Sequence, residues 1–346
     1  MTGAVGQKRV PTNYLKKQLV PVAPIDQQKR IVAKIEELFS HIDAGIAALN
    51  QAKQLLKQYR QSVLKAAVTG ELTKEWREQN KHKLEPASKL LERILQERRQ
   101  KWEAQQLEQF KAKGKMPKDD KWKEKYKELK LPKDSIDMPE EWCLVNWEAI
   151  LSVTDDAPFK RGPFGSALKK SFFVETGYKV YEQYCPINDD CSYERYYITE
   201  KKFKELEAFS VKADDFLISC SGSLGRITQV PKKFKAGVIN QALLRVRLNP
   251  QVISNEYFKM FFRSPYFQKL IFENVSGVAI PNVKGVKELK AIPVPLPSLK
   301  EQKAIFEKAT EILFSIKRLE IQVESKLIKA EKNKQAILAS AFSGKL

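Results

Sequence analysis

The sequence PVAPIDQQKR, at residues 21–30, opens a segment that recurs as PLPSLKEQKA at residues 295–304. The offset between the copies is 274 residues, and the two align without a gap as far as Gly70-Glu71-Leu72 and Gly344-Lys345-Leu346. A constant offset over more than 50 positions indicates an internal repeat, which has to be identified before a fold is assigned. The chain is therefore organised around one segment that occurs twice.

Each copy is predicted to form a long helix. The prolines before Ile25 cannot continue a helix, Asp26 can accept hydrogen bonds from the first turn, and Gly70 is a natural end. Some 40 residues in each copy, at a rise of ~1.5 Å per residue, give a rod of ~60 Å.

Apolar residues in both copies follow a heptad, so we expect the two helices to pack on each other as a coiled-coil-like pair. In the first copy one heptad position is large and the other is mostly small, including Gly45. Two separate helices lying on other cores are the alternative, which the ungapped repeat disfavours. The predicted pairing residues are Ile35, Leu38, Ile42, Leu49, Leu56, Tyr59 and Val63 in the first copy, and Ile312, Ile316, Leu319, Val323 and Ile337 in the second.

The same offset extends upstream, because Gly3 and Leu15 fall on Gly277 and Leu289. We therefore expect the chain to begin inside a unit whose complete version ends near residue 291. The expected segments are 1–19, the tail of a missing upstream domain; 20–72, the first long helix; 73–135, a polar helical spacer; 136–291, a globular domain; and 292–346, the second long helix.

The spacer is dominated by Lys, Glu and Gln, and Gly114-Lys115-Met116-Pro117 is predicted to break its helix. Residues 111–130 are rich in lysine. Such a run is usually a solvated face, and we favour that interpretation over a specific contact with DNA.

The globular domain is predicted to be mixed α/β, because short β-rich runs precede one helical stretch. The predicted strands are Leu144–Val153, Tyr178–Tyr184, Phe216–Cys220, Arg226–Val230 and Val238–Leu248. The stretch Asn255–Asn274 is predicted to be a helix whose many aromatic residues face the core rather than form a base-stacking platform.

Composition and charge bound the function. The net charge is +20, and every segment contributes: +6 for residues 1–73, +4 for 74–141, +6 for 142–291 and +4 for 292–346. A long basic surface of this kind favours a polyanionic partner, most simply nucleic acid, over charge for solubility alone. No apolar run approaches the ~18 residues of a membrane span, and no signal region opens the chain. We expect a cytoplasmic protein with no membrane partner.

The motifs of several enzyme classes are missing. Asn249-Pro250-Gln251-Val252 lacks the second proline and the aromatic residue of an adenine methyltransferase loop, and Gly222-Ser223-Leu224-Gly225-Arg226 does not match a phosphate-binding loop. The only histidines, His41 and His82, lie outside the globular domain, so Ser–His or Cys–His catalysis is not available there. The paired acids at 155–156, 189–190 and 214–215 are typical of turns. We expect no catalytic residue, no metal site and no cofactor in this chain, with four scattered cysteines and no disulfide framework.

Three polar stretches of the globular domain are candidate DNA contacts. The first, residues 159–170, is a glycine loop ringed by cations, whose amides can approach phosphates and whose charges can neutralise them. The second, residues 219–226, is a turn with hydroxyls and an arginine, which can read guanine; the third is an amide pair suited to adenine. The candidates are Lys160, Arg161, Gly162, Ser166, Lys169, Lys170, Tyr184, Ser221, Ser223, Arg226, Asn240 and Gln241. Alternatively, the glycine turns only join strands and the two amides only satisfy backbone groups.

The order of these pieces resembles the specificity subunit of type I restriction–modification systems. Each long helix follows a proline-rich lead and ends near Gly-x-Leu, and the domain between them opens at Pro139-Glu140-Glu141-Trp142. The resemblance covers essentially the whole chain and rests on Pro21–Lys34 with Val68–Leu72, Leu131–Trp142, Gly222–Arg226, Ala279-Ile280-Pro281-Asn282, and Pro293–Gln302 with Phe342–Leu346. No single motif decides it; their order and the repeat do.

The resemblance implies a function. In this family each target recognition domain reads one half of a gapped DNA target, and the two helices pair antiparallel as a ruler for the gap. The helices also dock methyltransferase subunits, and motor/nuclease subunits complete the restriction complex. The specificity subunit has no catalysis of its own; its partners use S-adenosylmethionine, ATP and Mg.

This chain departs from the family pattern, because it has one complete recognition domain where a full subunit has two. We therefore expect a half-length specificity subunit, formed naturally or cut from a longer protein, that reads one half-site and could pair with a second copy. The alternative is a regulatory or assembly fragment that binds partner subunits through its helices without reading DNA. A self-contained restriction enzyme is a weaker third possibility, because its motifs are missing.

Overall fold

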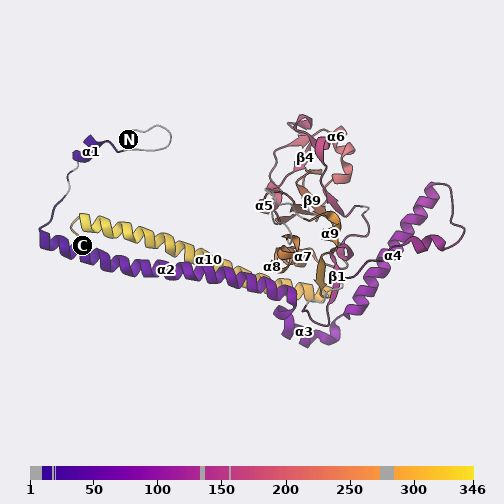
Figure 1. Ribbon diagram of the computed structural model, residues 1–346, viewed down its shortest axis with the longest axis horizontal. Helices are drawn as coiled ribbons and strands as arrows, with labels where there is room; N and C mark the ends of the chain where they lie inside the picture. The colour runs from indigo at the N-terminus through magenta and orange to yellow at the C-terminus, as the bar shows by residue number, and fades with distance from the viewer. Residues whose placement is uncertain (1–9, 18, 20, 133–136, 156, 273–283) are drawn as a thin grey trace. The chain divides into compact units, whose positions relative to one another are not determined.

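The computed structural model describes residues 10–17, 19, 21–132, 137–155, 157–272 and 284–346 (Figure 1). The chain forms two compact units. Residues 1–59 and 315–346 form the first, here called the helical unit, and residues 60–314 form the second, the globular unit. Most of the expected tail 1–19, the family motif at 279–282 and the end of the predicted helix at 273–274 lie outside the described residues.

The helical unit is built from the two long helices, α2 (Ile25–Thr69) and α10 (Leu299–Phe342). Lys53 Nζ lies 2.7 Å from Glu324 Oε2, and Lys334 pairs with Asp43. A step of ten residues forward on α10 is thus matched by ten residues backward on α2, so the helices run antiparallel, side by side (Figure 1). The short helix α1 (Thr12–Lys16) buries no residue.

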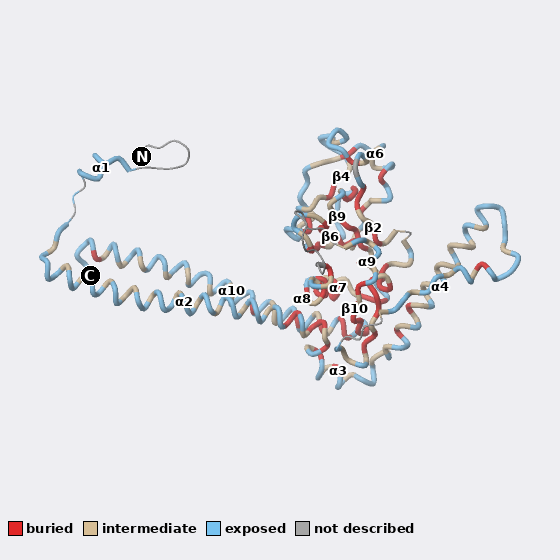
Figure 2. Tube along the Cα trace, in the orientation of Figure 1, coloured by how far each residue is buried: buried red, intermediate tan, exposed pale blue. Residues whose placement is uncertain are grey.

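The seam between the helices is half-buried on both sides (Figure 2). Two predicted pairing residues lie outside it, because Tyr59 is 53% and Leu319 is 48% exposed. A strict seven-residue repeat drifts around a helix of 3.6 residues per turn. The half-buried position therefore shifts by one residue, from Gly45 to Ile46 and from Tyr59 to Arg60. The predicted residues that are half-buried or buried are Ile35, Leu38, Ile42, Leu49, Leu56, Ile316, Val323 and Ile337. In the globular unit, Val63 is buried and Ile312 is half-buried.

We expect Gly45→Ala to stabilise the chain by about 0.5–1 kcal/mol, because glycine costs about that much relative to alanine inside a helix. A Cβ at this position would meet nothing within 4 Å. Urea unfolding followed by helical circular dichroism measures the change. A loss of stability would instead place Gly45 in a close helix–helix contact, as the sequence pattern predicted.

The internal repeat is also present in local structure. Gln28 Nε2 donates to Ala23 O at 2.6 Å, and its counterpart Gln302 Nε2 donates to Pro297 O at 2.9 Å. Each copy ends on a left-handed glycine, Gly70 with φ 83° and Gly344 with φ 71°. The same side-chain bond thus fastens the proline-rich lead at the start of each helix, and the same cap ends it.

The described residues of the globular unit form three sheets. In the first, the order β2-β9-β6-β7 joins Phe159–Arg161, Leu243–Val246, Phe216–Ser219 and Ile227–Gln229 by antiparallel pairs. In the second, the order β3-β5-β4-β8 joins Phe173–Val174, Tyr197–Ile198, Tyr178–Tyr181 and Gly237–Ile239, with β4 and β8 parallel. The third pairs β1 (Cys143–Asn146) with β10 (Pro293–Leu296).

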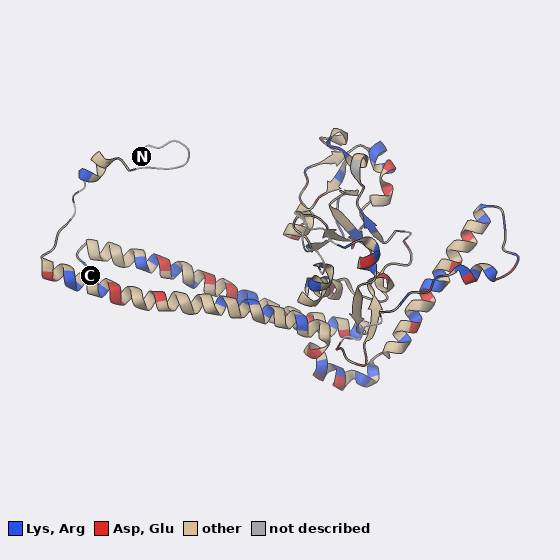
Figure 3. Ribbon diagram, in the orientation of Figure 1, with Lys and Arg blue, Asp and Glu red and all other residues tan. Residues whose placement is uncertain are grey.

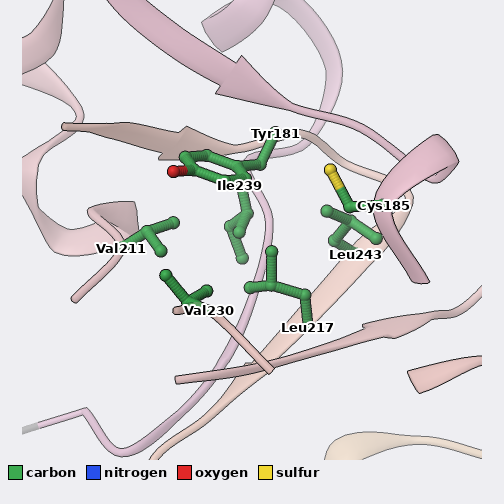
Figure 4. Packing of buried hydrophobic residues seen from close by; sticks show 7 residues of the cluster. All are labelled: Tyr181, Cys185, Val211, Leu217, Val230, Ile239 and Leu243. Atoms are coloured by element: carbon green, nitrogen blue, oxygen red, sulfur yellow. The ribbon is translucent and has the colours of Figure 1, made fainter. Parts of the chain in front are cut away.

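One apolar cluster joins the first two sheets (Figure 4). Tyr181 and Ile239 come from β4 and β8, whereas Leu217 and Leu243 come from β6 and β9. A second core surrounds the Trp147 ring, which meets Phe159 at 5.1 Å and Phe267 at 5.0 Å between ring centroids. In the predicted helix 255–274, Tyr257, Phe258, Phe261, Phe262 and Phe267 are therefore core residues, as expected from the sequence.

Several predicted boundaries were wrong, each for a local reason. The strand predicted to reach Val153 ends at Asn146, whose side chain accepts a hydrogen bond from Ala149 N and caps a 3-10 turn at Trp147–Ile150. The strand predicted to reach Tyr184 ends at Tyr181, and Tyr184 begins the helix α5 (Tyr184–Asn188).

The predicted strand Val238–Leu248 is two strands in different sheets, because Asn240 turns the chain between β8 and β9. The predicted helix 255–274 is α7 (Asn255–Arg263) and α8 (Pro265–Phe272). Ser264 Oγ accepts from Phe267 N, and Pro265 has no N–H to continue α7.

The spacer is helical, as predicted. It contains α3 (Lys74–Asn80), α4 (Ala87–Ala112) and a 3-10 turn at Lys121–Lys125, and α4 ends just before the predicted break at Gly114. The remaining helices are α6 (Glu200–Glu205) and α9 (Val286–Lys290). None of the helices in the described part of the chain is long and apolar enough to cross a membrane.

A buried network fastens the first turn of α10. Glu301 is 1% exposed, and its carboxylate accepts from Thr73 Oγ1 at 2.8 Å, Arg77 Nε at 3.0 Å and Trp142 Nε1 at 2.9 Å. The neighbouring Gln302 is fully buried; its amide accepts from Ser254 N at 2.7 Å and donates to Val252 O at 2.9 Å. Glu301 and Gln302, at the start of the second copy of the repeat, therefore fasten α10 within the globular unit.

Candidate nucleic-acid interface

Four polar segments meet where the strands of two sheets end. Gly162 N donates to Leu243 O at 2.9 Å, Cys220 N donates to Ala242 O at 2.8 Å, and Asn240 N donates to Tyr181 O at 3.0 Å. The ends of β2, β6 and β4 thus converge on the turn between β8 and β9. We call this surface the strand-end edge; it comprises residues 161–162, 183–184, 219–223 and 240–242. All three stretches singled out from the sequence contribute to it.

Gly162 has a different role from the one predicted. It is buried, and its amide is occupied by Leu243 O, so it does not offer an N–H to phosphate. A Cβ built on Gly162 would lie 1.9 Å from Asn240 O and 3.1 Å from Gln241 Cα. Glycine is therefore required here because the two backbones touch.

A second contact ties α5 to the turn after β6. Gln183 Nε2 donates to Ser221 Oγ at 3.2 Å and also to Ser221 O. Ser223 contributes its backbone, because its carbonyl accepts from Ser219 Oγ, and its side chain is exposed. Arg226 donates its backbone N–H to Ser219 Oγ at 3.1 Å and exposes its side chain. These hydrogen bonds order the backbone of the turn and leave the side chains of Ser223 and Arg226 accessible.

The two amide residues at the edge, Asn240 and Gln241, differ in whether their side chains are used within the fold. Asn240 Oδ1 accepts from Ala242 N at 3.1 Å, so this oxygen satisfies a backbone N–H of the turn. This agrees with the alternative interpretation, in which the amides serve backbone groups. Gln241 is exposed. Arg161 is half-buried, and its Nε has no hydrogen-bond partner among the described residues. Its guanidinium lies 6.0 Å from the ring centroid of Phe164.

Exposed aromatic rings accompany these groups, and sequence reasoning missed two of them. Phe164 is 71% exposed, and Tyr184 stacks on Tyr193 with ring centroids 4.0 Å apart. Apolar rings can contact the thymine methyl group in the major groove. Phe164 lies inside the glycine loop 159–170, so the signal was present; Tyr193 and Gln183 carried no local signal, because only the fold brings them to the edge.

The remaining cationic candidates do not all join the edge. Successive residues of a strand face opposite sides, and Lys160 Nζ lies 4.9 Å from the ring of Phe209, away from Arg161. Ser166 and Lys170 are exposed on the 3-10 turns Gly165–Leu168 and Lys170–Phe172, and Lys169 is exposed between the two turns. Leu168 anchors these turns by packing in the core of the second sheet.

Titratable groups beside the edge favour neutral forms. Burial raises the pKa of the Cys220 thiol to about 11, although Arg161 opposes the shift. Burial also raises the pKa of Glu182, against the attraction of Arg195. The thiol is therefore protonated at neutral pH and is not a nucleophile there. The described residues also contain no group of three or more His, Cys, Asp or Glu side chains that could hold a metal ion.

Comparisons with known proteins agree along the chain. Residues 165–330 match the family model of the "Type I restriction modification DNA specificity domain". The type I restriction enzyme EcoBI specificity subunit of Escherichia coli is 26% identical, over 100% of this chain and 62% of that protein. The EcoKI specificity subunit of Escherichia coli strain K12 is 24% identical, over 94% of this chain and 57% of that protein. The chain therefore spans about three fifths of the length of these relatives.

Two solved structures share the fold. A chain of a type I R-M system, solved to explain complex assembly and conformational transition, aligns with a TM-score of 0.64 at 16% identity, over 99% of this chain and 66% of that one. The HsdS subunit from Thermoanaerobacter tengcongensis aligns with a TM-score of 0.50 at 17% identity, over 100% of this chain and 65% of that one. At these identities the likeness concerns the fold alone.

Proposed function

Because this chain belongs with the type I restriction–modification specificity subunits, and carries their DNA specificity domain at residues 165–330, we propose that it reads one half of a gapped DNA target. The observation that carries the proposal is the strand-end edge. Hydroxyl, amide, guanidinium and aromatic groups from separate segments lie together there on a rigid base of two sheets. In this proposal residues 136–291 are the recognition domain, residues 20–72 and 292–346 are the ruler helices, and residues 73–135 are a spacer.

Sequence-specific binding is the decisive test. Selection of bound duplexes from a random pool should recover a motif of a few base pairs, measured at stated salt because phosphate contacts are salt-dependent. A pool with no enrichment would favour the assembly fragment that binds only partner subunits.

Substitutions at the edge and beside it should separate base contacts from phosphate contacts. Arg226→Ala should relax the preference at one base position by about 1–3 kcal/mol, since a good bidentate pair discriminates by that much. Arg161→Ala and Lys169→Ala should weaken binding to all sequences and lower the salt slope by about 1 each. Unchanged affinity and preference in all three variants would contradict this assignment of residues.

The partners follow from the same proposal. The chain would dock methyltransferase subunits through its paired helices and, through them, motor/nuclease subunits that restrict unmodified DNA in the cytoplasm. S-adenosylmethionine, ATP and Mg would be used by those subunits and not by this chain. A second copy could supply the other half-site. Light scattering of the pure chain, with and without methyltransferase, tests both the pairing of two copies and the docking of methyltransferase. A chain that stays monomeric and gains no mass when methyltransferase is added would contradict both.

A further inference from the structure

Part of the spacer folds into an arm with its own aromatic cluster. We define the arm as residues 101–130, which comprise the end of α4 and the returning segment with its 3-10 turn. Trp122 is buried and lies 5.9 Å from both Trp102 and Phe110, and Tyr126 lies 5.4 Å from Trp102, all between ring centroids. An aromatic cluster of this size replaces the core that so short a segment otherwise lacks.

Both ends of the arm are fastened to the globular domain. On the outgoing side, Leu90 and Ile94 are buried, and Arg98 Nη1 donates to Glu148 O at 2.9 Å. On the returning side, Asn146 Nδ2 donates to Lys130 O at 2.9 Å. The lysine-rich run 111–130, which the sequence suggested to be an ordinary solvated face, is therefore held on a folded support.

Lys outnumbers Asp and Glu along the arm (Figure 3). Residues 111–130 have a net charge of +5. Eight of their lysines are exposed and form no ion pair among the described residues, whereas Lys123 pairs with Asp120 at 3.1 Å. The exposed lysines are Lys111, Lys113, Lys115, Lys118, Lys121, Lys125, Lys127 and Lys130. A groove of about 1260 Å³ beside the arm is also lined by Lys287 of α9 and by Lys290, which pairs with Glu148 at 3.0 Å.

The side chains exposed on this surface favour one class of binding partner. Protein–protein interfaces are depleted in lysine and need an apolar centre. Within the described residues 101–132, only Met116 and Leu131 are large apolar side chains that are exposed. Lysine ammonium groups bind phosphate as point charges and do not require a fixed geometry. A regular polyanion therefore suits the arm better than a protein surface does.

We propose that the arm binds the phosphate backbone of duplex DNA without reading its sequence, as a second contact separate from the strand-end edge. This inference rests on the proposed DNA-binding function and adds to it a non-specific holding site. The arm would retain the duplex through charge while the edge tests the bases, which is how backbone contacts position a protein without carrying sequence information.

The test uses the full chain and two duplexes of equal length, one random and one holding the selected motif. The arm variant changes Lys111, Lys113, Lys115 and Lys118 to Gln. If all four contact phosphate, the slope of log affinity against log salt should fall by about 3.6, so the affinity lost between about 50 and 200 mM salt should shrink by about a hundredfold. The preference for the motif over the random duplex should not change.

Two control variants separate the effect of the arm lysines from the effect of total charge. Changing the same four lysines to Arg keeps the charge and should keep the slope. Changing the exposed Lys57, Lys326, Lys329 and Lys332 of the long helices to Gln removes equal charge elsewhere and should change the slope by less than about 1. Circular dichroism and tryptophan fluorescence, which reports on Trp102 and Trp122, verify that the arm is folded.

Three outcomes would overturn the inference: a wild-type slope in the arm variant, an equal loss in the long-helix control, or loss of methyltransferase binding with DNA binding intact. The last would assign the arm to a protein partner. Failure of the proposed function itself has a different signature, because the motif and random duplexes would then bind equally in every variant, including the unchanged chain.

Discussion

Glu301→Ala is expected to lower the free energy of unfolding of the globular unit by about 3–5 kcal/mol, the cost of breaking a buried ion pair by removing one partner. The substitution leaves the Arg77 guanidinium buried without its carboxylate and removes the acceptor of Trp142 Nε1. Thr73 loses its partner as well. Urea unfolding followed by tryptophan fluorescence measures the loss, because Trp142 belongs to the network.

The matched control is Glu307→Ala on the same helix. Glu307 lies 3.9 Å from Lys303, and both side chains are mostly exposed, so this substitution should cost at most about 1 kcal/mol. Equal effects from Glu301 and Glu307 would show that the buried network contributes no more than a surface pair. Replacing Glu301 and Arg77 together by apolar residues should recover part of the loss, because the isolated charge is then removed.

Gly162→Ala is expected to remove most of the sequence preference of DNA binding. The new methyl group would overlap Asn240 O, so the turn 240–242 must move. Because Cys220 is hydrogen-bonded to this turn and Arg161 lies next to it, the surroundings of both residues would change as well. Overpacking of this kind costs about 1–3 kcal/mol of stability. Discrimination at each base read by the displaced groups should fall by about 5- to 150-fold, which is the value of one bidentate contact.

Gly285→Ala is the control for Gly162. A Cβ there would meet only Glu288 Oε2, at 3.2 Å, which is the end of a flexible side chain. We expect motif selection and stability close to those of the unchanged chain. Retained preference in Gly162→Ala, with normal folding, would mean that the turn between β8 and β9 does not take part in reading DNA.

The candidate site illustrates how far local sequence patterns reach. Glycine loops, a serine–arginine turn and an amide pair were visible as separate stretches, and three backbone hydrogen bonds bring them together. Gln183 and Tyr193 could not be found in this way, because nothing in their own neighbourhoods marks them. Lys160 does not join the edge for a simple reason: a residue next to Arg161 on a strand faces the other side.

Local patterns were enough to predict the two long helices, their repeat and a family resemblance, because periodicity and capping are properties of neighbouring residues. What those motifs do depends on contacts that form only in the folded chain. Glu301 and Gln302 fasten α10 to distant segments, and Gly162 allows two strand ends to touch. The lysines of the arm became a surface only when Trp122 packed against Trp102. Such contacts join residues far apart in the chain, and their partners are fixed by packing, which no local pattern specifies.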